Sequence, residues 1–216
     1  MRRRRAILLT LGVLCLLAAL GLTVRDLHGE TRARKTAAQT LRLLEPQISA
    51  AQPQAEPQPQ TGEEEPEPQA IPDYQLDPQR QMPVFRVDGI DYIGLLEIPE
   101  LELRLPVAGT WSYEALAAAP CRYAGSAYLD DLVILAHNYR GFFRDLKLLH
   151  TGDAVRFTDA DGNVFSYAVS DFEQLHPSQT EDMLCGDWDL TLFTCTVGGQ
   201  ERLAVRCVRA NGSESE

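Results

Sequence analysis

From Met82 onward, short apolar runs alternate with turn-forming residues, which is the pattern of a chain that folds into many short strands. A short helix is expected at Thr110–Pro120, and Pro177–Asp187 is expected to be a loop or a short helix. The expected strands are Tyr92–Ile98, Leu101–Val107, Asp131–Asn138, the two arms of a hairpin across 154–175, and two strands across 189–207 joined at Gly198-Gly199. About seven or eight strands with few helices favour a mostly β fold, a closed or nearly closed β-barrel.

The N-terminal end has a different pattern. Four arginines, Arg2–Arg5, precede an uncharged run from Ala6 to Val24. An apolar run of about 19 residues is long enough to cross a bilayer as a helix, and no small-x-small cleavage site follows it. The sequence therefore predicts a tail at 1–5 and an uncleaved, single-pass transmembrane anchor at 6–24.

Residues 25–80 are predicted to form a stalk. A short polar helix fits Asp26–Leu44. From Glu45 to Gln79 the chain is rich in Pro, Gln and Glu, and it has too few large apolar residues to offset the entropy lost on folding. We expect this part to be an extended spacer between the anchor and a folded domain at 82–210.

Charge is distributed unevenly between the two parts. Residues 1–80 carry ten Lys/Arg and ten Asp/Glu, whereas residues 81–216 carry ten Lys/Arg and 21 Asp/Glu, and therefore the whole net charge of −11. An acidic domain argues against a nucleic-acid partner, because Lys and Arg are the residues that bind phosphate backbones.

The cysteines of the domain leave two explanations open. Cys15 lies in the apolar N-terminal run, and Cys121, Cys185, Cys195 and Cys207 lie in the domain. Without CxxC spacing or a His-x-His companion, they do not predict a zinc site. Four cysteines in an exported domain can form two disulfides, or they can be small buried hydrophobic residues beside one reactive thiol.

Three chemically active residues are predicted to lie at strand ends. His137 follows the apolar run VILA, Cys195 follows LTLFT, and Arg202 precedes LAV. A tight turn between Cys195 and Arg202 should bring these two residues onto adjacent antiparallel strands. A thiolate attacks carbonyl groups, an imidazole moves protons, and a guanidinium stabilises an oxyanion, so the set suits acyl transfer through a thioester.

Each of these residues alone also has a purely structural explanation. The cysteine could be a packed side chain or half of a disulfide, the histidine a hydrogen-bonded structural residue, and Arg202 a partner of Glu201 or Asp189. Their combination with a predicted tether and stalk favours the catalytic interpretation.

The domain resembles the sortases, the membrane-anchored cysteine transpeptidases of mainly Gram-positive bacteria. TLFTC at Thr191–Cys195 matches the TLxTC signature of that family, VILAHN resembles its histidine segment, and RLAVRC its arginine segment. LLEIPELELRLPV resembles the opening strand pair, and FFRDLKLLHTGDAVRF the segment after the histidine. The resemblance covers about 93–208 and implies the sortase-type closed β-barrel.

The resemblance also implies an activity. Cys195 would form a thioester with the Thr carbonyl of an LPxTG-like C-terminal sorting signal, and His137 would protonate the leaving amine. Arg202 would hold the substrate and steady the oxyanion, while Thr194 and Asn138 would bind substrate or shape the site. The amine acceptor would be a peptidoglycan precursor or a pilin lysine, and the domain would lie outside the cell with the N-terminus in the cytoplasm.

The resemblance points to class B or a class D-like member. Asn138 directly after His137 is a class B feature, whereas the loop at Phe172–Asp189 is too short for the class B insertion. Asp77-Pro78-Gln79 lacks the aromatic residue of the lid motif in pilin sortases. No cofactor is expected: some class A members bind calcium, but this sequence does not indicate a site for it.

Two alternatives remain beside the transpeptidase. One is a tethered, non-enzymatic β-domain that binds a wall or host ligand, and the other is a sortase fold that only hydrolyses. A papain-like peptidase is disfavoured, because its cysteine comes early, at a helix N-terminus, whereas Cys195 follows both a strand and His137.

Overall fold

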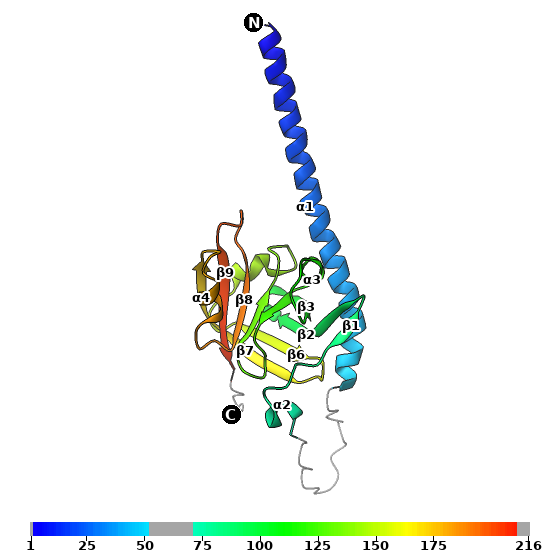
Figure 1. Cartoon of the computed structure of the whole chain (residues 1–216), viewed down its shortest axis with the longest axis vertical. Coiled ribbons are helices and arrows are strands. Elements are labelled where there is room, and N and C mark those ends of the chain that lie inside the picture. Colours follow the sequence, from blue (N-terminus) through cyan, green and yellow to red (C-terminus); the bar gives the residue numbers. More distant parts are fainter. Residues whose placement is uncertain (1, 52–70, 211–216) are drawn as a thin grey trace.

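The chain folds into a β-barrel flanked by one long helix (Figure 1). The structure, a computed structural model, describes the backbone of residues 2–51 and 71–210. Side chains are described from residue 11 onward, except those at 22, 23 and 25–27.

Within the described residues, nine strands form one sheet that closes on itself. The strands are β1 (Phe85–Val87), β2 (Ile90–Ile98), β3 (Leu103–Ala108), β4 (Cys121–Ala124), β5 (Leu132–Leu135), β6 (Ala154–Asp159), β7 (Val164–Leu175), β8 (Leu190–Cys195) and β9 (Arg202–Arg209). Their order is β1-β2-β3-β4-β5-β8-β9-β7-β6, and β6 also pairs with β2. The ring from β2 to β6 is thus a closed barrel of eight strands, and β1 is an addition to it. The predicted closed β-barrel is confirmed; β1 and β4 were not predicted.

Short helices lie in the connections. They are α2 (Asp73–Leu76), η1 (Pro99–Leu101), α3 (Tyr113–Ala118), η2 (Phe143–Leu148) and α4 (Thr180–Leu184). The Ser112 hydroxyl caps α3 by accepting a hydrogen bond from the Ala115 N–H.

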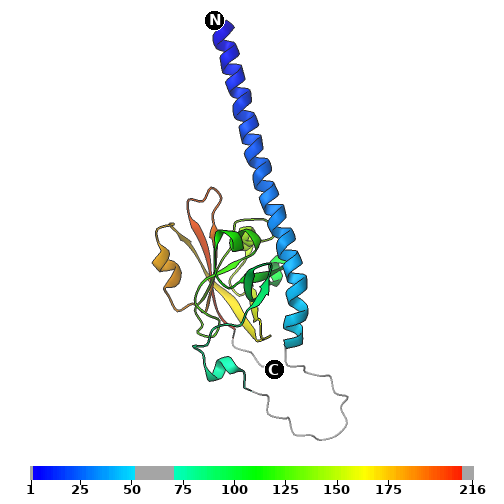
Figure 2. The same cartoon turned by 45° about the vertical axis from the view of Figure 1, so that its right-hand side comes forward.

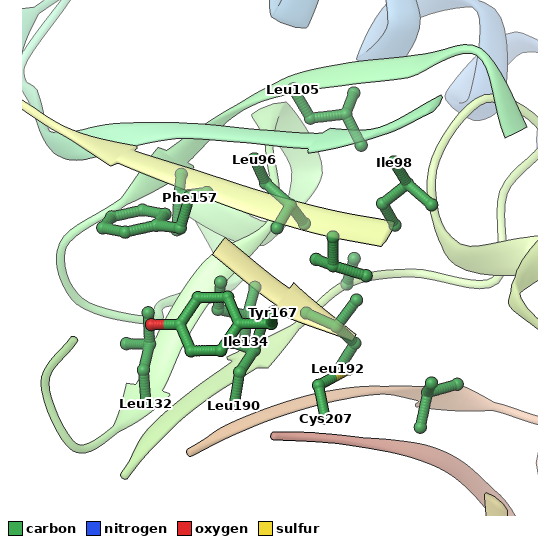
Figure 3. Close-up of a cluster of buried hydrophobic side chains, with 14 of the residues drawn as sticks. Leu96, Ile98, Leu105, Leu132, Ile134, Phe157, Tyr167, Leu190, Leu192 and Cys207 are labelled. Carbon is green, nitrogen blue, oxygen red and sulfur yellow. The ribbon is translucent and has the colours of Figure 1, made fainter. Parts of the chain in front are cut away.

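Apolar side chains from many strands fill the barrel. Figure 3 shows Leu96 and Ile98 of β2, Phe157 of β6 and Leu192 of β8 converging on the interior from different strands. Alternation along each strand sends every second side chain inward, which is the periodicity that the sequence displays.

The long helix α1 (Arg2–Ala51) packs against the outside of the barrel. Both views show it running along one side of the barrel and continuing past the end where the turn between β8 and β9 lies (Figures 1 and 2). One face of the helix is buried, at Glu30, Ala33, Ala37, Thr40, Leu44 and Ile48. Spacings of three and four residues place these side chains on a single helical stripe.

This packing differs from the predicted stalk. The helix predicted at Asp26–Leu44 is confirmed, but it continues to Ala51, where an extended chain was predicted. It also packs against the barrel instead of standing apart from it: Leu44 and Ile48 share a hydrophobic cluster with Tyr92 and Leu95 of β2. Small residues such as Ala33 and Ala37 let the helix approach the sheet closely, and the apolar outer face of β2 stabilises a helix that could not stand alone. The part of the predicted stalk at 52–70 lies outside the described residues.

The predicted anchor at 6–24 lies within α1. Over the part of the chain that the structure describes, no helix is both long and apolar enough to cross a membrane. The structure therefore does not support the predicted transmembrane helix.

Leu44→Ala should lower the free energy of unfolding, because Leu44 is completely buried between α1 and the barrel. We expect a loss of about 2–5 kcal/mol, the usual cost of truncating a buried leucine. The neighbouring Leu43, 52% exposed, provides the matched control: Leu43→Ala should stay within about 0.5 kcal/mol of the parent. Equal effects of the two substitutions in chemical denaturation would contradict the packing of α1.

Candidate active site

Strand β8 brings the site together because it lies between β5 and β9. It runs parallel to β5, with Phe193 opposite Leu135, and antiparallel to β9, with Cys195 directly opposite Arg202. Leu190 and Leu192 point into the barrel, so Phe193 and Cys195 point to its outer face. The predicted juxtaposition of Cys195 and Arg202 on neighbouring strands is therefore present.

His137 stands just beyond the end of β5, on the same side of the site. The N–H of Ala136 donates to the Phe193 carbonyl at 3.1 Å, which continues the pairing between β5 and β8 up to the residue before His137. The imidazole is half-buried, and this burial lowers the pKa of His137 below its ordinary value of 6.5. The resting side chain is therefore neutral at neutral pH and can accept a proton.

Arg202 is partly exposed at the start of β9. Its Nη1 donates to the carbonyls of Gly199 and Glu201, at 3.3 and 3.2 Å, so the guanidinium is held against the turn between β8 and β9. These bonds use only some of the five N–H donors of a guanidinium, and the side chain also lines the pocket described next.

A pocket of about 320 Å³ contains all three residues, His137, Cys195 and Arg202. Trp111, which precedes α3, and Tyr113, its first residue, form part of the wall, and the loop that carries α4 forms another part. The full lining is Trp111, Tyr113, Leu116, Tyr123, Leu135, Ala136, His137, His176, Pro177, Gln179, Thr180, Met183, Phe193, Cys195 and Arg202. A thiol, a neutral imidazole and a guanidinium at the end of a mainly apolar groove can together carry out acyl transfer.

The two other predicted site residues lie beside the pocket rather than in its lining. Thr194 is buried, and its hydroxyl donates to the Ala136 carbonyl at 2.8 Å, which ties the end of β8 to the end of β5. Asn138 follows His137, and its carbonyl accepts a hydrogen bond from Arg144 at 3.4 Å. Their placement suits residues that shape the site; their functional roles stay predictions.

Arg206 was not identified from the sequence. It lies on β9 opposite Thr191, on the same face of the strand as Arg202, and only 1% of it is exposed. Its guanidinium donates to Glu173 Oε2 at 2.7 Å and Thr191 Oγ1 at 3.0 Å, and to the carbonyls of Asp182 and Met183 at 2.7 and 3.0 Å. Arg206 thus fastens α4, and with it one wall of the pocket, to the barrel. An arginine inside the apolar stretch LAVRC was the available signal, but its partners are too distant in sequence to be inferred.

Of the two explanations that the sequence left open, disulfides are not formed among the described residues, and burial as small hydrophobic residues fits Cys121 and Cys207. All five are free thiols among the described residues. Cys121 and Cys207 are packed in hydrophobic clusters, Cys185 and Cys15 are exposed, and Cys195 is half-buried in the pocket. In the described part of the chain, no group of three or more His, Cys, Asp or Glu side chains could hold a metal ion.

The comparisons with known proteins identify the family. Residues 96–210, slightly more than half of the chain, match the family model described as the Sortase domain, and the chain therefore belongs to the sortase family, a family of transpeptidases. No curated protein matches the chain.

Solved sortases share the fold. Sortase C1 from Streptococcus suis is 28% identical with a TM-score of 0.50, over 58% of this chain and 76% of that one. Sortase C from Streptococcus pneumoniae is 25% identical with a TM-score of 0.51, over 61% and 74%. Sortase C from Clostridium perfringens, solved with the C-terminal cell wall sorting motif, is 26% identical with a TM-score of 0.50, over 56% and 71%.

Alkylation should separate the pocket thiol from the buried ones. Burial raises the pKa of Cys121 and of Cys207 to about 12, so at pH 8 only about one molecule in 10⁴ carries a thiolate at either position. Both are also closed to solvent. Iodoacetamide at pH 8 should therefore modify Cys195 and the exposed Cys15 and Cys185 in the folded protein. It should reach Cys121 and Cys207 only after denaturation, as read by peptide mass mapping. Labelling of Cys207 as fast as Cys195 in the folded protein would contradict this packing.

Proposed function

We propose that this sortase is a cysteine transpeptidase that cleaves an LPxTG-like C-terminal sorting signal and transfers the acyl part to an amine acceptor. The observation that carries the proposal is the common pocket in which Cys195, paired across the strands with Arg202, meets His137. The acceptor in this proposal is a cell-wall precursor or a pilin lysine.

In the first half of the reaction, the Cys195 sulfur attacks the carbonyl carbon of the Thr residue in the signal. The thiol proton passes to His137, whose lowered pKa keeps its imidazole neutral and ready to accept it. Arg202 hydrogen-bonds the developing oxyanion. When the Thr–Gly bond breaks, His137 gives the proton to the leaving amine, and the acyl part remains on Cys195 as a thioester.

In the second half, the acceptor amine attacks the thioester and loses a proton to His137. Collapse of the intermediate forms the new amide bond and releases the sulfur, which takes the proton back from His137 and regenerates the thiol. One amide bond is exchanged for another, so no oxidant, reductant or metal is required. Water in place of the amine would give hydrolysis by the same steps.

The pocket is suited to an extended peptide segment. Its lining is largely apolar and aromatic, with Trp111, Tyr123 and Met183 among the residues, and Cys195, His137 and Arg202 add the reactive polar groups. The Clostridium perfringens relative was solved with a cell wall sorting motif, and the Streptococcus pneumoniae relative is described in terms of pilin substrate specificity. These relatives support the same class of substrate for this chain.

The proposal includes attachment to the outer face of the cell membrane. It rests on the uncharged run Ala6–Val24, on Arg2–Arg5 before it, and on the family, since secreted substrates and wall precursors lie outside the cell. The described structure itself holds no helix long and apolar enough to cross a membrane. The N-terminal half of α1 projects beyond the same end of the barrel as the β8–β9 turn, which is an arrangement that would hold the pocket near an attached surface (Figure 1).

Incubating the full chain with a pool of LPxTG-like peptides and triglycine should give joined products detectable by mass spectrometry. Cys195→Ala should abolish them, because Cys195 is the only cysteine among the residues that line the described pocket. Arg202→Lys should slow them by about 10²-fold through loss of the oxyanion contact. Cys185→Ala, which removes an exposed thiol in the neighbouring loop, is the matched control and should retain activity.

Cleavage without joined products would favour the hydrolytic alternative. Products that persist in Cys195→Ala would show that the thioester assignment is wrong. A parent chain without any cleavage, whose Cys195 is also inert to alkylation, would favour a ligand-binding domain.

A further inference from the structure

Helix α1 meets the loop that follows His137 at a buried carboxylate. Only 9% of Glu30 is exposed. Its Oε1 accepts a hydrogen bond from the backbone N–H of Arg140 at 2.5 Å, and its Oε2 accepts one from Nη2 of Arg144 at 3.2 Å. One side chain of α1 therefore holds two points of a loop that begins more than 100 positions later in the sequence.

The loop transmits this contact to His137. The Arg144 guanidinium that binds Glu30 also donates to the carbonyl of Asn138, the residue after the histidine, at 3.4 Å. The His137 carbonyl accepts the N–H of Tyr139 at 2.8 Å, one residue before the amide that Glu30 holds. Glu30 thus fixes backbone on the C-terminal side of His137 both directly and through Arg144.

Side-chain packing reinforces the same connection. The ring of Tyr139 packs against the imidazole of His137 in a tilted arrangement, with 4.7 Å between centroids and 30° between planes. The phenol oxygen of Tyr139 reaches α1 at Gly29, where an added Cβ would lie 3.7 Å from it. Arg34 of α1 covers Gly141, where an added Cβ would lie 2.9 Å from the guanidinium Nε. Two successive turns of α1, at Gly29, Glu30 and Arg34, therefore touch the loop.

A charge at this depth must be compensated. A buried carboxylate is stable only with charged or N–H partners, and here both partners belong to the His137 loop. Replacing the carboxylate with a neutral side chain would weaken its hydrogen bonds to the Arg140 amide and the Arg144 guanidinium, and the loop would be free to move. Glu30 does not line the pocket and cannot touch a substrate bound there, so any effect on catalysis must act through the loop.

We propose that Glu30 is a positioning residue of the active site, and that α1 is part of the catalytic unit rather than a spacer. The helix sets the position of the His137 imidazole relative to Cys195 by holding the Arg140 amide and the Arg144 guanidinium. This inference rests on the proposed function. Misplacing a catalytic group by about 1 Å can cost up to 10²-fold in rate.

The test uses the full chain and compares two Glu→Gln substitutions on the same helix. Glu45 also binds the barrel from α1, through Arg104 of β3 at 2.7 Å, but it does not contact the His137 loop. With an LPxTG-like peptide and triglycine, Glu30→Gln should lower kcat about 10-fold with KM within about twofold of the parent. Glu45→Gln should leave both constants unchanged.

Equal effects of the two substitutions would show that only docking of α1 matters, and an unchanged kcat in Glu30→Gln would overturn the proposal. If Glu30→Gln does not fold, Arg144→Gln removes the same bridge from the other side and should show the same fall in kcat.

A second readout does not depend on activity. The chain has four histidines, so the His137 signal in a ¹³C-histidine NMR spectrum can be assigned with His137→Gln. Glu30→Gln should shift or broaden that signal, whereas Glu45→Gln should not. An identical His137 signal in the parent, Glu30→Gln and Glu45→Gln would contradict the positioning role of Glu30, whether or not the parent chain is active. Absence of transpeptidation by the parent chain, taken alone, would count only against the proposed function.

Discussion

The arrangement of the site depends on the register of β8 between its two neighbours. Parallel pairing with β5 brings His137 to the same level as Cys195, and antiparallel pairing with β9 puts Arg202 opposite that thiol. A shift of one residue in either pairing would turn the odd-numbered side chains of β8 into the barrel and the leucines out of it. Burial of Leu190 and Leu192 therefore fixes the register, and the same apolar packing that stabilises the barrel aligns the three pocket residues.

Two buried charges then hold the segments around the strand ends. Arg206 binds the carbonyls of Asp182 and Met183 in α4, and Glu30 binds the loop after His137, so each of these two connections beside the pocket is held by a buried charged side chain. Removing one partner of such a group is costly because it leaves a buried charge unpaired. The connections between strands gain a defined position in this way, as catalysis requires.

Much of this architecture could be read from the sequence, for identifiable reasons. Strict alternation in segments such as 154–175 predicts strands, and the tight Gly198-Gly199 turn predicts that Cys195 and Arg202 are neighbours. No local pattern in the sequence predicts that β2 pairs with β6. A closed barrel was expected only because many short strands with few helices favour that fold class.

The role of α1 could not be read in the same way. Its buried stripe contains alanines, a threonine and a glutamate, which look like a solvated helix until the apolar outer face of β2 is placed beside them. The contacts of Glu30 and Arg206 could not be predicted either. The partners of Glu30 lie 110 and 114 residues away along the chain, and those of Arg206 lie 15 to 33 residues away. Long-range partners of buried charges are set by the assembled fold, and local patterns do not encode them.

The measurement that tests the account most directly is the intact mass of the protein after exposure to an LPxTG-like peptide without an acceptor, quenched in acid. The account predicts a covalent adduct with the mass of the acyl fragment ending in Thr, mapped to Cys195 and absent from Cys195→Ala. An adduct on Cys185, or cleavage of the peptide without any dependence on Cys195, would contradict it.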